Sequence, residues 1–255
     1  MQTPIIRLSD VSLSFTIRNG LFKHHTNQIL NSINIDISQG ETLGLIGRNG
    51  CGKSTLLRLI AGVFTPDSGS IERHGARVSI LSLAVGFDPE LSGRDNILLS
   101  ATLLGLSKED ITRNYESIVD FSELGEFIQQ PVRIYSSGMR MRLGFAIAIT
   151  MKPDVLLIDE ALGVGDAAFR IKAENALSEK IRSNQTVVLV SHTSTQIARL
   201  CDRVLWLENG AICMQGEAQQ VLDSYEQHLT ISSKPSHTYS ELSRQTNIGA
   251  KNRML

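Results

Sequence analysis

No run of about 18 or more apolar residues occurs in this chain of 255 residues, so its sequence offers no candidate for a bilayer-spanning helix. The N-terminal stretch MQTPIIRLSDVSLSF lacks the basic residues and the apolar core of a secretory signal. The three cysteines are sparse and have no metal-ligand spacing, which fits a reducing compartment better than a disulfide framework. A formal net charge of -1 argues against a protein that binds nucleic acid by neutralising its phosphates.

What remains is the composition of an ordinary globular protein, with 42% hydrophobic and 20% charged residues. The length suits one large α/β domain, or one domain and a short tail. Alternating β-branched residues predict strands over residues 5–17 and 28–37, and another strand is expected over 77–83. Continuous apolar runs at 155–158 and 187–190 predict strands that are buried on both faces of a parallel sheet.

Helical spacing and turn residues predict the remaining elements. The pattern is mostly helical over residues 94–127, and a second helix is predicted over 137–150. Apolar runs on either side of Glu208-Asn209-Gly210 predict a hairpin with a tight turn. After Gln227 the chain becomes polar, which predicts a tail that is mobile or depends on a partner.

A glycine-rich loop is the most specific motif in the chain. Residues 47–55 read GRNGCGKST and match the phosphate-binding pattern G-x-x-x-x-G-K-[ST] between a predicted strand and a predicted helix. The glycines let backbone N–H groups surround an anion, and the helix N-terminus adds positive partial charge. Lys53 then reaches the β- and γ-phosphates of a nucleotide, while the Ser54 hydroxyl binds Mg²⁺. The predicted nucleotide-binding residues are Gly47, Asn49, Gly50, Cys51, Gly52, Lys53, Ser54 and Thr55.

Cys51 inside this loop has two interpretations. A thiol beside a helix N-terminus can be redox-sensitive, because positive partial charge stabilises the thiolate. The alternative is a small residue at a variable position of the motif, and we favour that alternative.

Two carboxylates follow the apolar run at 155–158. Asp159 is the predicted Mg²⁺ partner, because ligands bind at the carboxyl ends of parallel strands. Glu160 points elsewhere as the next residue, and it is predicted to polarise the attacking water. An acidic pair after a strand is also a common cap, but the phosphate-binding loop upstream weakens that interpretation.

The segment Tyr135-Ser136-Ser137-Gly138-Met139 resembles the signature L-S-G-G-Q of ABC ATPases, and it lies just before a predicted helix and the acidic strand, as in that family. Ser136 and Gly138 match the pattern, whereas Ser137 replaces a glycine and Met139 replaces the glutamine. The resemblance implies that Ser136, Ser137 and Gly138 bind the γ-phosphate of an ATP molecule held by a second copy of the chain.

The same resemblance implies roles for three further residues. His192, which follows a buried strand, would contact the γ-phosphate and position the attacking water. Asp166 falls where the family has its D-loop aspartate, although ALGVGD departs from the common S-A-L-D. Phe15 would stack on adenine, with a core strand residue as an equal alternative. The family's glutamine after the strand at 77–83 is absent, and Ser82 is the nearest polar residue.

Two stretches narrow the resemblance, which covers residues 5–225. AVGFDPELSGRDNI at 84–97 and YSSGMRMRLGFAIAI at 135–149 resemble the ATPase subunits of O-antigen, capsule and teichoic-acid exporters, in the short form without a C-terminal carbohydrate-binding domain. This implies an ATPase that drives lipid-linked polysaccharide export from the cytoplasmic side of the bacterial inner membrane. The implied partners are a second copy of the chain, integral membrane permease subunits that dock around residues 87–97, and the lipid-linked glycan, with no nucleic acid.

The resemblance also implies a fold: an α/β P-loop ABC nucleotide-binding domain with a mainly parallel core sheet, an antiparallel β subdomain and an inserted helical subdomain. We expect this domain over residues 1–227, with the helical subdomain at about 90–150 and the polar tail over 228–255. Three alternatives stay open: the ATPase of an importer or of a drug or lipid exporter, a non-transport ABC ATPase, and a small P-loop kinase. The kinase would lack the signature and His192.

The predicted connection at 18–27, RNGLFKHHTN, is basic and turn-rich. It is either a solvated hairpin tip or a site for the anionic headgroup or pyrophosphate of the lipid-linked substrate. If the second hypothesis is correct, replacing Arg18 and Lys23 with Ala impairs export but spares ATPase activity. Both quantities can be measured in the same cells and membranes. Intact export in the double variant would sink the binding hypothesis.

Overall fold

The computed structural model describes residues 3–19, 23–81, 86–103, 106–150, 153–159, 166–191 and 193–232, with the side chains of 17–25, 231 and 232 excepted. The strands in this part of the chain are β1 (Ile6–Asn19), β2 (Lys23–Ile37), β3 (Thr42–Ile46), β4 (Ser68–Glu72), β5 (Val78–Leu81), β6 (Val155–Asp159), β7 (Thr186–Val190), β8 (Arg203–Glu208) and β9 (Ala211–Glu217). The helices are α1 (Lys53–Ile60), α2 (Gly93–Leu103), α3 (Lys108–Ser122), α4 (Ser137–Thr150), α5 (Ala167–Arg182), α6 (Ser194–Leu200) and α7 (Ala218–Ser232), with short 3-10 helices η1 (Gly125–Gln129) and η2 (Val132–Ile134).

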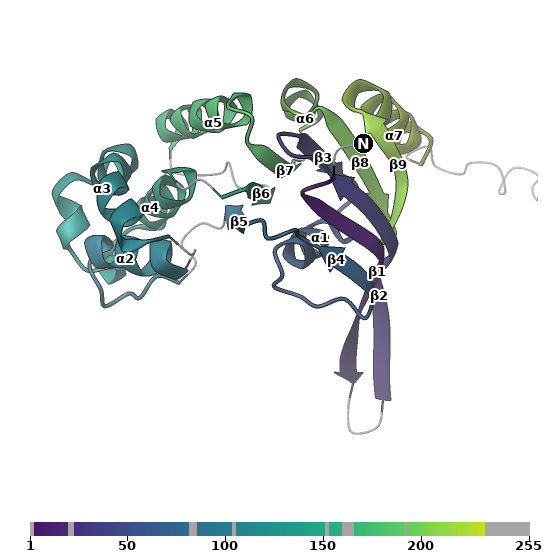
Figure 1. The fold of residues 1–255 in the computed structure, drawn as a ribbon, viewed down its shortest axis with the longest axis horizontal. Coiled ribbons are helices and arrows are strands. Elements are labelled where there is room, and N and C mark those ends of the chain that lie inside the picture. Colours follow the sequence, from purple (N-terminus) through teal and green to yellow (C-terminus); the bar gives the residue numbers. More distant parts are fainter. Residues whose placement is uncertain are drawn as a thin grey trace, which may run out of the picture.

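A six-stranded sheet forms the centre of the molecule, in the order β5-β6-β7-β3-β8-β9 (Figure 1). Its pairs are parallel except for β8 and β9. Every residue of β3 and β7 is buried, as two-sided parallel strands require. Helix α1 packs on one face of the sheet, and α5, α6 and α7 pack on the other. The predicted α/β class with a mainly parallel core sheet is confirmed.

An antiparallel sheet, β2-β1-β4, lies on the α1 side of the core. Strands β1 and β2 pair from Ile6 and Ile37 out to Asn19 and Lys23, well beyond the part of β1 that β4 covers. The outer pairs form a two-stranded ribbon that projects from the body in Figure 1. The connection predicted at 18–27 is therefore too long, because most of these residues belong to β1 and β2.

Polar composition does not predict strands in this segment, because cross-strand pairs can stabilise a ribbon without an apolar face. The hydroxyl oxygens of Thr16 and Thr26, for example, lie 3.3 Å apart. The side chains of Arg18 and Lys23 lie outside the described residues, so the proposed role of this basic segment stays a prediction.

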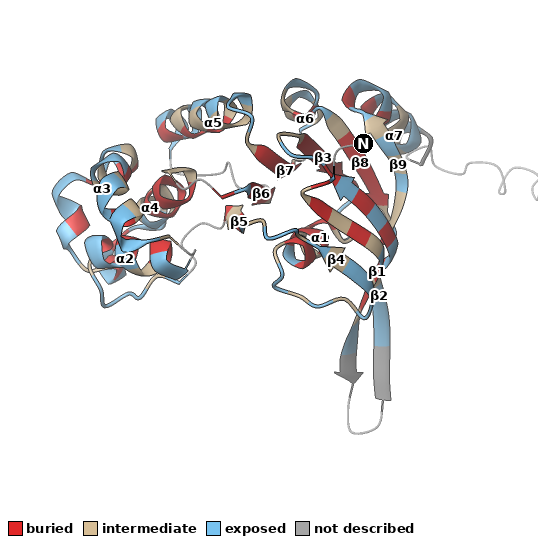
Figure 2. Ribbon diagram, viewed as in Figure 1, coloured by how far each residue is buried: buried red, intermediate tan, exposed pale blue. Residues whose placement is uncertain are grey.

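Helices α2, α3 and α4 lie between β5 and β6 in the sequence and form a separate lobe (Figure 1). The lobe has its own apolar core, in which Ile97, Ile118 and Leu143 are at most 1% exposed. Figure 2 shows this core as the buried residues on the facing sides of these helices. Helix α4 has the bounds that the sequence predicted, Ser137–Thr150.

Strands β8 and β9 form the predicted hairpin. Its turn residues Asn209 and Gly210 have φ angles of 48° and 78°, the positive values that a tight two-residue hairpin turn needs. Helix α7 runs to Ser232, beyond the domain boundary expected at Gln227. No helix in the described ranges is long and apolar enough to cross a membrane.

A fully buried asparagine fixes the loop that leads into α2. The amide oxygen of Asn96 accepts a hydrogen bond from the backbone N–H of Asp88 at 2.8 Å. Its amide nitrogen lies within hydrogen-bond distance of the carbonyl oxygens of Asp88, Leu91 and Ser92, at 2.9, 3.1 and 2.9 Å. One buried side chain therefore ties together the backbone of Asp88, Leu91 and Ser92, and these contacts satisfy its own polar atoms.

Replacing Asn96 with Ala is expected to lower the free energy of unfolding by about 2–3 kcal/mol, because the loop loses several hydrogen bonds at once and a cavity is left at a fully buried position. Urea unfolding of the purified protein measures this loss. Asn114 is the matched control: its side-chain amide donates to the Asp110 carbonyl at 2.7 Å on a half-buried helix face, so Asn114→Ala should cost well under half as much. Equal losses in the two variants would contradict the role given to Asn96.

Candidate functional site

The site lies at the carboxyl edge of the parallel sheet. Leu45 of β3 pairs with Val190 of β7, which in turn pairs with Asp159 of β6. These three residues therefore form one row across the sheet. Two strand spacings separate the ends of the row, a distance of about 10 Å. Asp159 thus lies across a single strand from the start of the glycine-rich loop, which follows β3.

Close backbone contacts explain two glycines of the loop. A Cβ atom at Gly47 would lie 2.1 Å from the carbonyl oxygen of Leu207, and the residue has a φ of 147°. Gly52 has a φ of 109° and immediately precedes α1. A glycine in that position offers no side-chain acceptor, so the first N–H groups of α1 can bind an anion instead.

Lys53 is folded back over the loop and is only 6% exposed. Its ammonium donates to the carbonyl oxygens of Gly47 and Arg48, at 2.8 and 3.1 Å. A buried cation is costly unless it is paired, and these two dipoles pair it only in part. The loop therefore presents a concentrated positive charge to a phosphate. Asn49 and Gly50 are exposed, and Ser54 and Thr55 are half-buried on the first turn of α1.

Cys51 lies beneath the loop rather than at its surface. The thiol is in a residue only 7% exposed, and its sulfur would be 2.7 Å from a Cβ at Gly47. Burial raises the pKa of the Cys51 thiol, with Lys53 opposing this more weakly. Since a redox-sensitive cysteine needs a lowered pKa and access to solvent, the geometry favours the small-residue interpretation.

The signature-like segment lies at the start of α4. The Ser136 hydroxyl accepts from the backbone N–H of Met139 at 3.1 Å and so caps the helix. Ser136 and Ser137 are exposed and Gly138 is half-buried, so they present hydroxyls and a helix N-terminus outward. The preceding Tyr135 anchors the segment: it is buried, and its hydroxyl donates to the Phe127 carbonyl at 2.6 Å.

Asp166 is the N-cap of α5. Its carboxylate accepts from the backbone N–H of Phe169 at 2.9 Å and pairs with the Arg142 guanidinium of α4. The hydrogen bond from Phe169 and, to a smaller degree, Arg142 lower the pKa of this carboxyl. These contacts are all within the chain, so the nucleotide-binding role of Asp166 stays a prediction.

Phe15 has a partner that the sequence did not reveal. The Phe15 side chain is 39% exposed, and its ring packs edge-to-face against Phe64 with centroids 5.5 Å apart. Phe64 follows α1 in a loop that Asp67 ties to β1 by accepting from the backbone N–H of Ser14 at 2.7 Å. The ring that is predicted to stack on adenine is therefore braced by the segment after the phosphate-binding helix. Stacking itself stays a prediction.

Glu160, His192 and Ser82 lie outside the described residues, and their roles stay predictions. The strands that precede Glu160 and His192 are neighbours, because Asp159 at the end of β6 pairs with Val190 at the end of β7. The topology thus starts both segments from the edge of the sheet that carries the glycine-rich loop.

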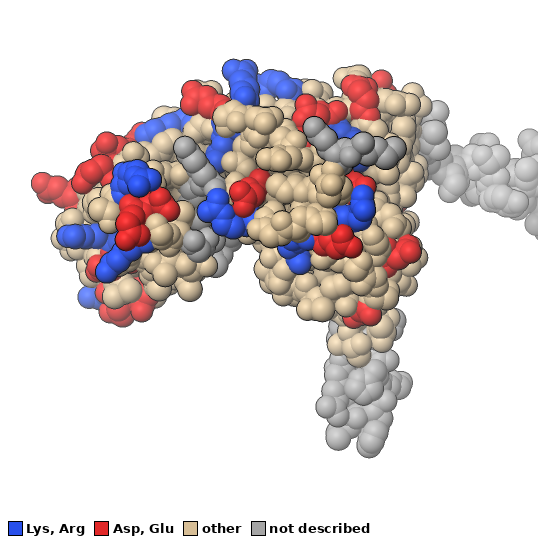
Figure 3. Space-filling model, viewed as in Figure 1, with Lys and Arg blue, Asp and Glu red and all other residues tan. Residues whose placement is uncertain are grey.

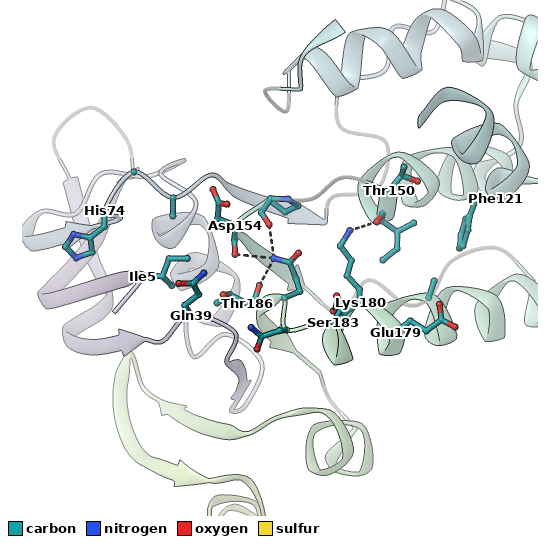
Figure 4. A pocket seen from close by; sticks show the side chains of 17 residues that line it. Ile5, Gln39, His74, Phe121, Thr150, Asp154, Glu179, Lys180, Ser183 and Thr186 are labelled. Atoms are coloured by element: carbon teal, nitrogen blue, oxygen red, sulfur yellow. Dashed lines mark hydrogen bonds between the residues drawn. The ribbon is translucent and has the colours of Figure 1, made fainter. Parts of the chain in front are cut away.

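A cavity lies at the opposite edge. It has a volume of about 840 Å³ and is lined at the amino ends of β6 and β7 by Asp154 and Thr186, with Lys180 of α5 nearby (Figure 4). Gln185 also lines the cavity and donates a hydrogen bond to the Pro153 carbonyl at 2.8 Å. Because ligands of parallel sheets bind at the carboxyl ends of the strands, this cavity is not the phosphate site.

Comparisons with known proteins agree with the geometry. A family profile described as "ABC transporter" matches residues 30–163. The chain is 45% identical to the O-antigen export system ATP-binding protein RfbB of Klebsiella pneumoniae, over 81% of this chain and 84% of that protein. It is 42% identical to the teichoic acids export ATP-binding protein TagH of Staphylococcus haemolyticus, over 81% and 78% of the two chains.

A solved structure shares the fold. The dimeric post-hydrolysis state of the ATP-binding cassette MJ0796, bound to ADP and Pi, superposes with a TM-score of 0.68 at 20% identity. The match covers 84% of this chain and 98% of that one. The arrangement of core sheet, antiparallel sheet and helical lobe is therefore that of known cassettes.

Thiol chemistry tests the buried position of Cys51. At pH 8, N-ethylmaleimide should modify the exposed Cys213 first, while Cys51 and Cys201 react slowly. Burial raises the pKa of Cys51, and it raises the pKa of Cys201 to about 12, so both stay protonated at this pH. Mass spectrometry of the labelled peptides gives the three rates, with Cys213 as the internal control. Labelling of Cys51 as fast as that of Cys213 would restore the redox interpretation.

Proposed function

This chain belongs to the ABC transporter family, and we propose that it is the ATP-hydrolysing subunit of a bacterial exporter of lipid-linked polysaccharide of the O-antigen or capsule type. One observation supports the ATPase part most directly. The Lys53 ammonium is buried in a glycine-rich loop that lies one strand away from Asp159 at the same sheet edge. ATP is the substrate that such a loop binds in this family.

The residues at this edge suit Mg²⁺. A hydroxyl from Ser54 and a carboxylate from Asp159 are hard oxygen donors, and Mg²⁺ is typically held by one or two such groups together with substrate phosphates and water. No cluster of three acidic, histidine or cysteine residues that would select another metal occurs within the described residues. Bound Mg²⁺ would neutralise charge on the β- and γ-phosphates.

The chain's own residues then have separate roles in ATP hydrolysis. Lys53 and the N–H groups of the loop hold the phosphates, and Glu160 polarises the attacking water. His192 positions that water against the γ-phosphate. These roles for Glu160 and His192 rest on their places in the sequence, directly after β6 and shortly after β7.

A second copy completes the site. The exposed hydroxyls of Ser136 and Ser137 and the α4 N-terminus point outward, where they can bind the γ-phosphate on a partner copy. The dimeric cassette with a similar fold supports this arrangement. Asp166 is proposed to contact the nucleotide at the interface between the two copies. Phe15 is proposed to stack on the adenine.

The helical lobe is the proposed docking surface for the membrane permease. Exposed large apolar side chains gather there: Leu91, Leu98, Leu103, Phe127 and Ile134 are 37%, 42%, 67%, 54% and 53% exposed. Apolar side chains that face water at this density favour an interface. Acidic and basic residues are interspersed over the lobe in Figure 3, so this face offers no basic surface for nucleic acid. Docking there would place the subunit peripherally on the cytoplasmic side of the inner membrane.

The substrate follows from the relatives rather than from the site. The two relatives named above are ATP-binding proteins of O-antigen export and of teichoic acids export, and each is more than 40% identical to this chain. An ABC ATPase of another transporter, an importer or a drug or lipid exporter, is the second candidate, since the nucleotide site is common to all of them.

Replacing Glu160 with Gln tests the proposal in the native host. A carboxamide cannot polarise the water, so the variant should bind ATP, form a trapped ATP-bound dimer and hydrolyse ATP at least about 100-fold more slowly. Surface polysaccharide on a gel should disappear, with lipid-linked glycan accumulating inside the cell. Glu109→Gln, at an exposed position of α3, is the control and should leave both unchanged.

Two outcomes would count against the proposal in different ways. Normal surface glycan in a strain whose Glu160→Gln protein is verified as inactive would move the substrate to the second candidate class. Undiminished ATP hydrolysis by the variant would overturn the assignment of Glu160 itself.

A further inference from the structure

Three helices meet at a junction of aromatic rings. Helices α3, α4 and α5 contribute one phenylalanine each: Phe121, Phe145 and Phe169. The ring centroid of Phe121 lies 5.8 Å from that of Phe145 and 5.8 Å from that of Phe169. The centroids of Phe145 and Phe169 are 6.2 Å apart. Phe145 and Phe169 are at most 1% exposed. This aromatic junction joins the helical lobe to the core, because α5 belongs to the core layer.

Four charged side chains cover the aromatic junction. Arg142 of α4 lies 5.1 Å above the Phe169 ring and pairs with Asp166 at the start of α5. Lys172 of α5 lies 4.7 Å above the Phe121 ring. Glu123, at the end of α3, contacts both cations: its carboxylate oxygens are 3.4 Å from Arg142 and 2.8 Å from Lys172.

The two cations are well placed for strong interactions. The Arg142 side chain is 21% exposed and the Lys172 side chain 36%, and each stacks on an aromatic ring. Partial desolvation strengthens cation–π contacts and ion pairs relative to the open surface. Lys172 also donates to the Phe121 carbonyl at 3.1 Å, so it binds the last turn of α3 by backbone and by side chain.

The backbone conformation at Glu123 indicates that its carboxylate has a specific role. Glu123 caps α3 with φ 55° and ψ 31°, the left-handed region in which glycine or asparagine is usual. A residue with a Cβ atom, such as glutamate, is conformationally strained in this region. A helix end alone does not require this residue type, so the carboxylate between Arg142 and Lys172 is what distinguishes it from a glycine.

The position of Arg142 links this cluster to the signature-like segment. Helix α4 begins at Ser137, directly behind Ser136, and Arg142 lies on its second turn. Arg142 also pairs with Asp166, the N-cap of α5, which is the helix that follows β6 in the chain. A shift of Arg142 would therefore change how the signature-like segment faces a second copy, while the phosphate loop on the other face of the sheet would stay in place.

We propose that Glu123 and Lys172 are positioning residues for ATP hydrolysis: together they hold Arg142, and with it α4, in the orientation that presents Ser136–Gly138 to the nucleotide of a second copy. This inference rests on the proposed ATP sandwich. Glu123 neutralises two cations that would otherwise repel one another across the junction, and Asp166 alone cannot do this, because it reaches only Arg142.

Steady-state ATPase kinetics of the full chain with its permease test the inference. Glu123→Gln and Lys172→Met should each lower kcat by about fivefold, since a displaced α4 presents Ser136–Gly138 less well to the nucleotide of the second copy in the transition state. The KM for ATP should stay within about twofold, as should the affinity of the isolated chain for a fluorescent ATP analogue. High salt should lower kcat of the parent protein toward that of Glu123→Gln.

Two matched variants separate positioning from stability. Glu126→Gln changes an exposed glutamate only three residues further along, whose carboxylate makes no ion pair in the described part of the chain, and it should leave kcat unchanged. Glu123→Asn suits the left-handed backbone, and the relief of that strain should offset the lost ion pairs, so this variant should fold about as stably as the parent protein and still lose kcat.

Parent-level kcat in both Glu123→Gln and Glu123→Asn would overturn the inference. It would also be overturned if the loss of kcat were matched by weaker binding of the ATP analogue and a lower melting temperature, because that pattern marks a general structural role. The outcome is separable from the export proposal: these assays measure ATP turnover, whereas the identity of the exported glycan is decided by the Glu160→Gln strain.

Discussion

The parallel pairing of β3, β7 and β6 is the constraint on which the site depends. It places Leu45, Val190 and Asp159 in one row, so that the segments following the three strands all start from one edge of the sheet. Polar groups for phosphate chemistry can then come from the ends of these strands and the segments that follow them, while the strands remain almost wholly apolar. The core and the site are therefore not in competition for the same residues.

The phosphate loop gives this edge of the sheet its positive charge. Packing against the Leu207 carbonyl leaves no room for a side chain at Gly47, and the Lys53 ammonium folds back onto the Gly47 carbonyl. The ammonium is held by backbone dipoles alone among the described residues, without a carboxylate. An incoming phosphate therefore meets a cation that does not first have to break an ion pair.

Local signals made part of this structure predictable. The loop at 47–55, the strand before Asp159, α4 and the turn at Asn209 and Gly210 are each encoded within about ten neighbouring residues. Contacts between distant residues were not predictable. Asn96, Phe64 and the Glu123–Lys172 pair gave no sequence signal, because their partners are chosen by packing. The length of the β1–β2 ribbon was missed for the same reason, since strand pairing depends on the partner strand.

The helical lobe contains both elements that local sequence predicts and contacts that depend on packing. Its exposed apolar side chains, such as Leu103 and Phe127, face outward, whereas its aromatic and charged contacts with α5 face the core. A partner bound on the outer face would act on α4 through a rigid apolar core and through a few ion pairs at the junction. Packed cores transmit displacement with little compression, and ion pairs can exchange partners. Such a division would allow the lobe to move as one body while the phosphate loop, at the edge of the sheet before α1, keeps its geometry.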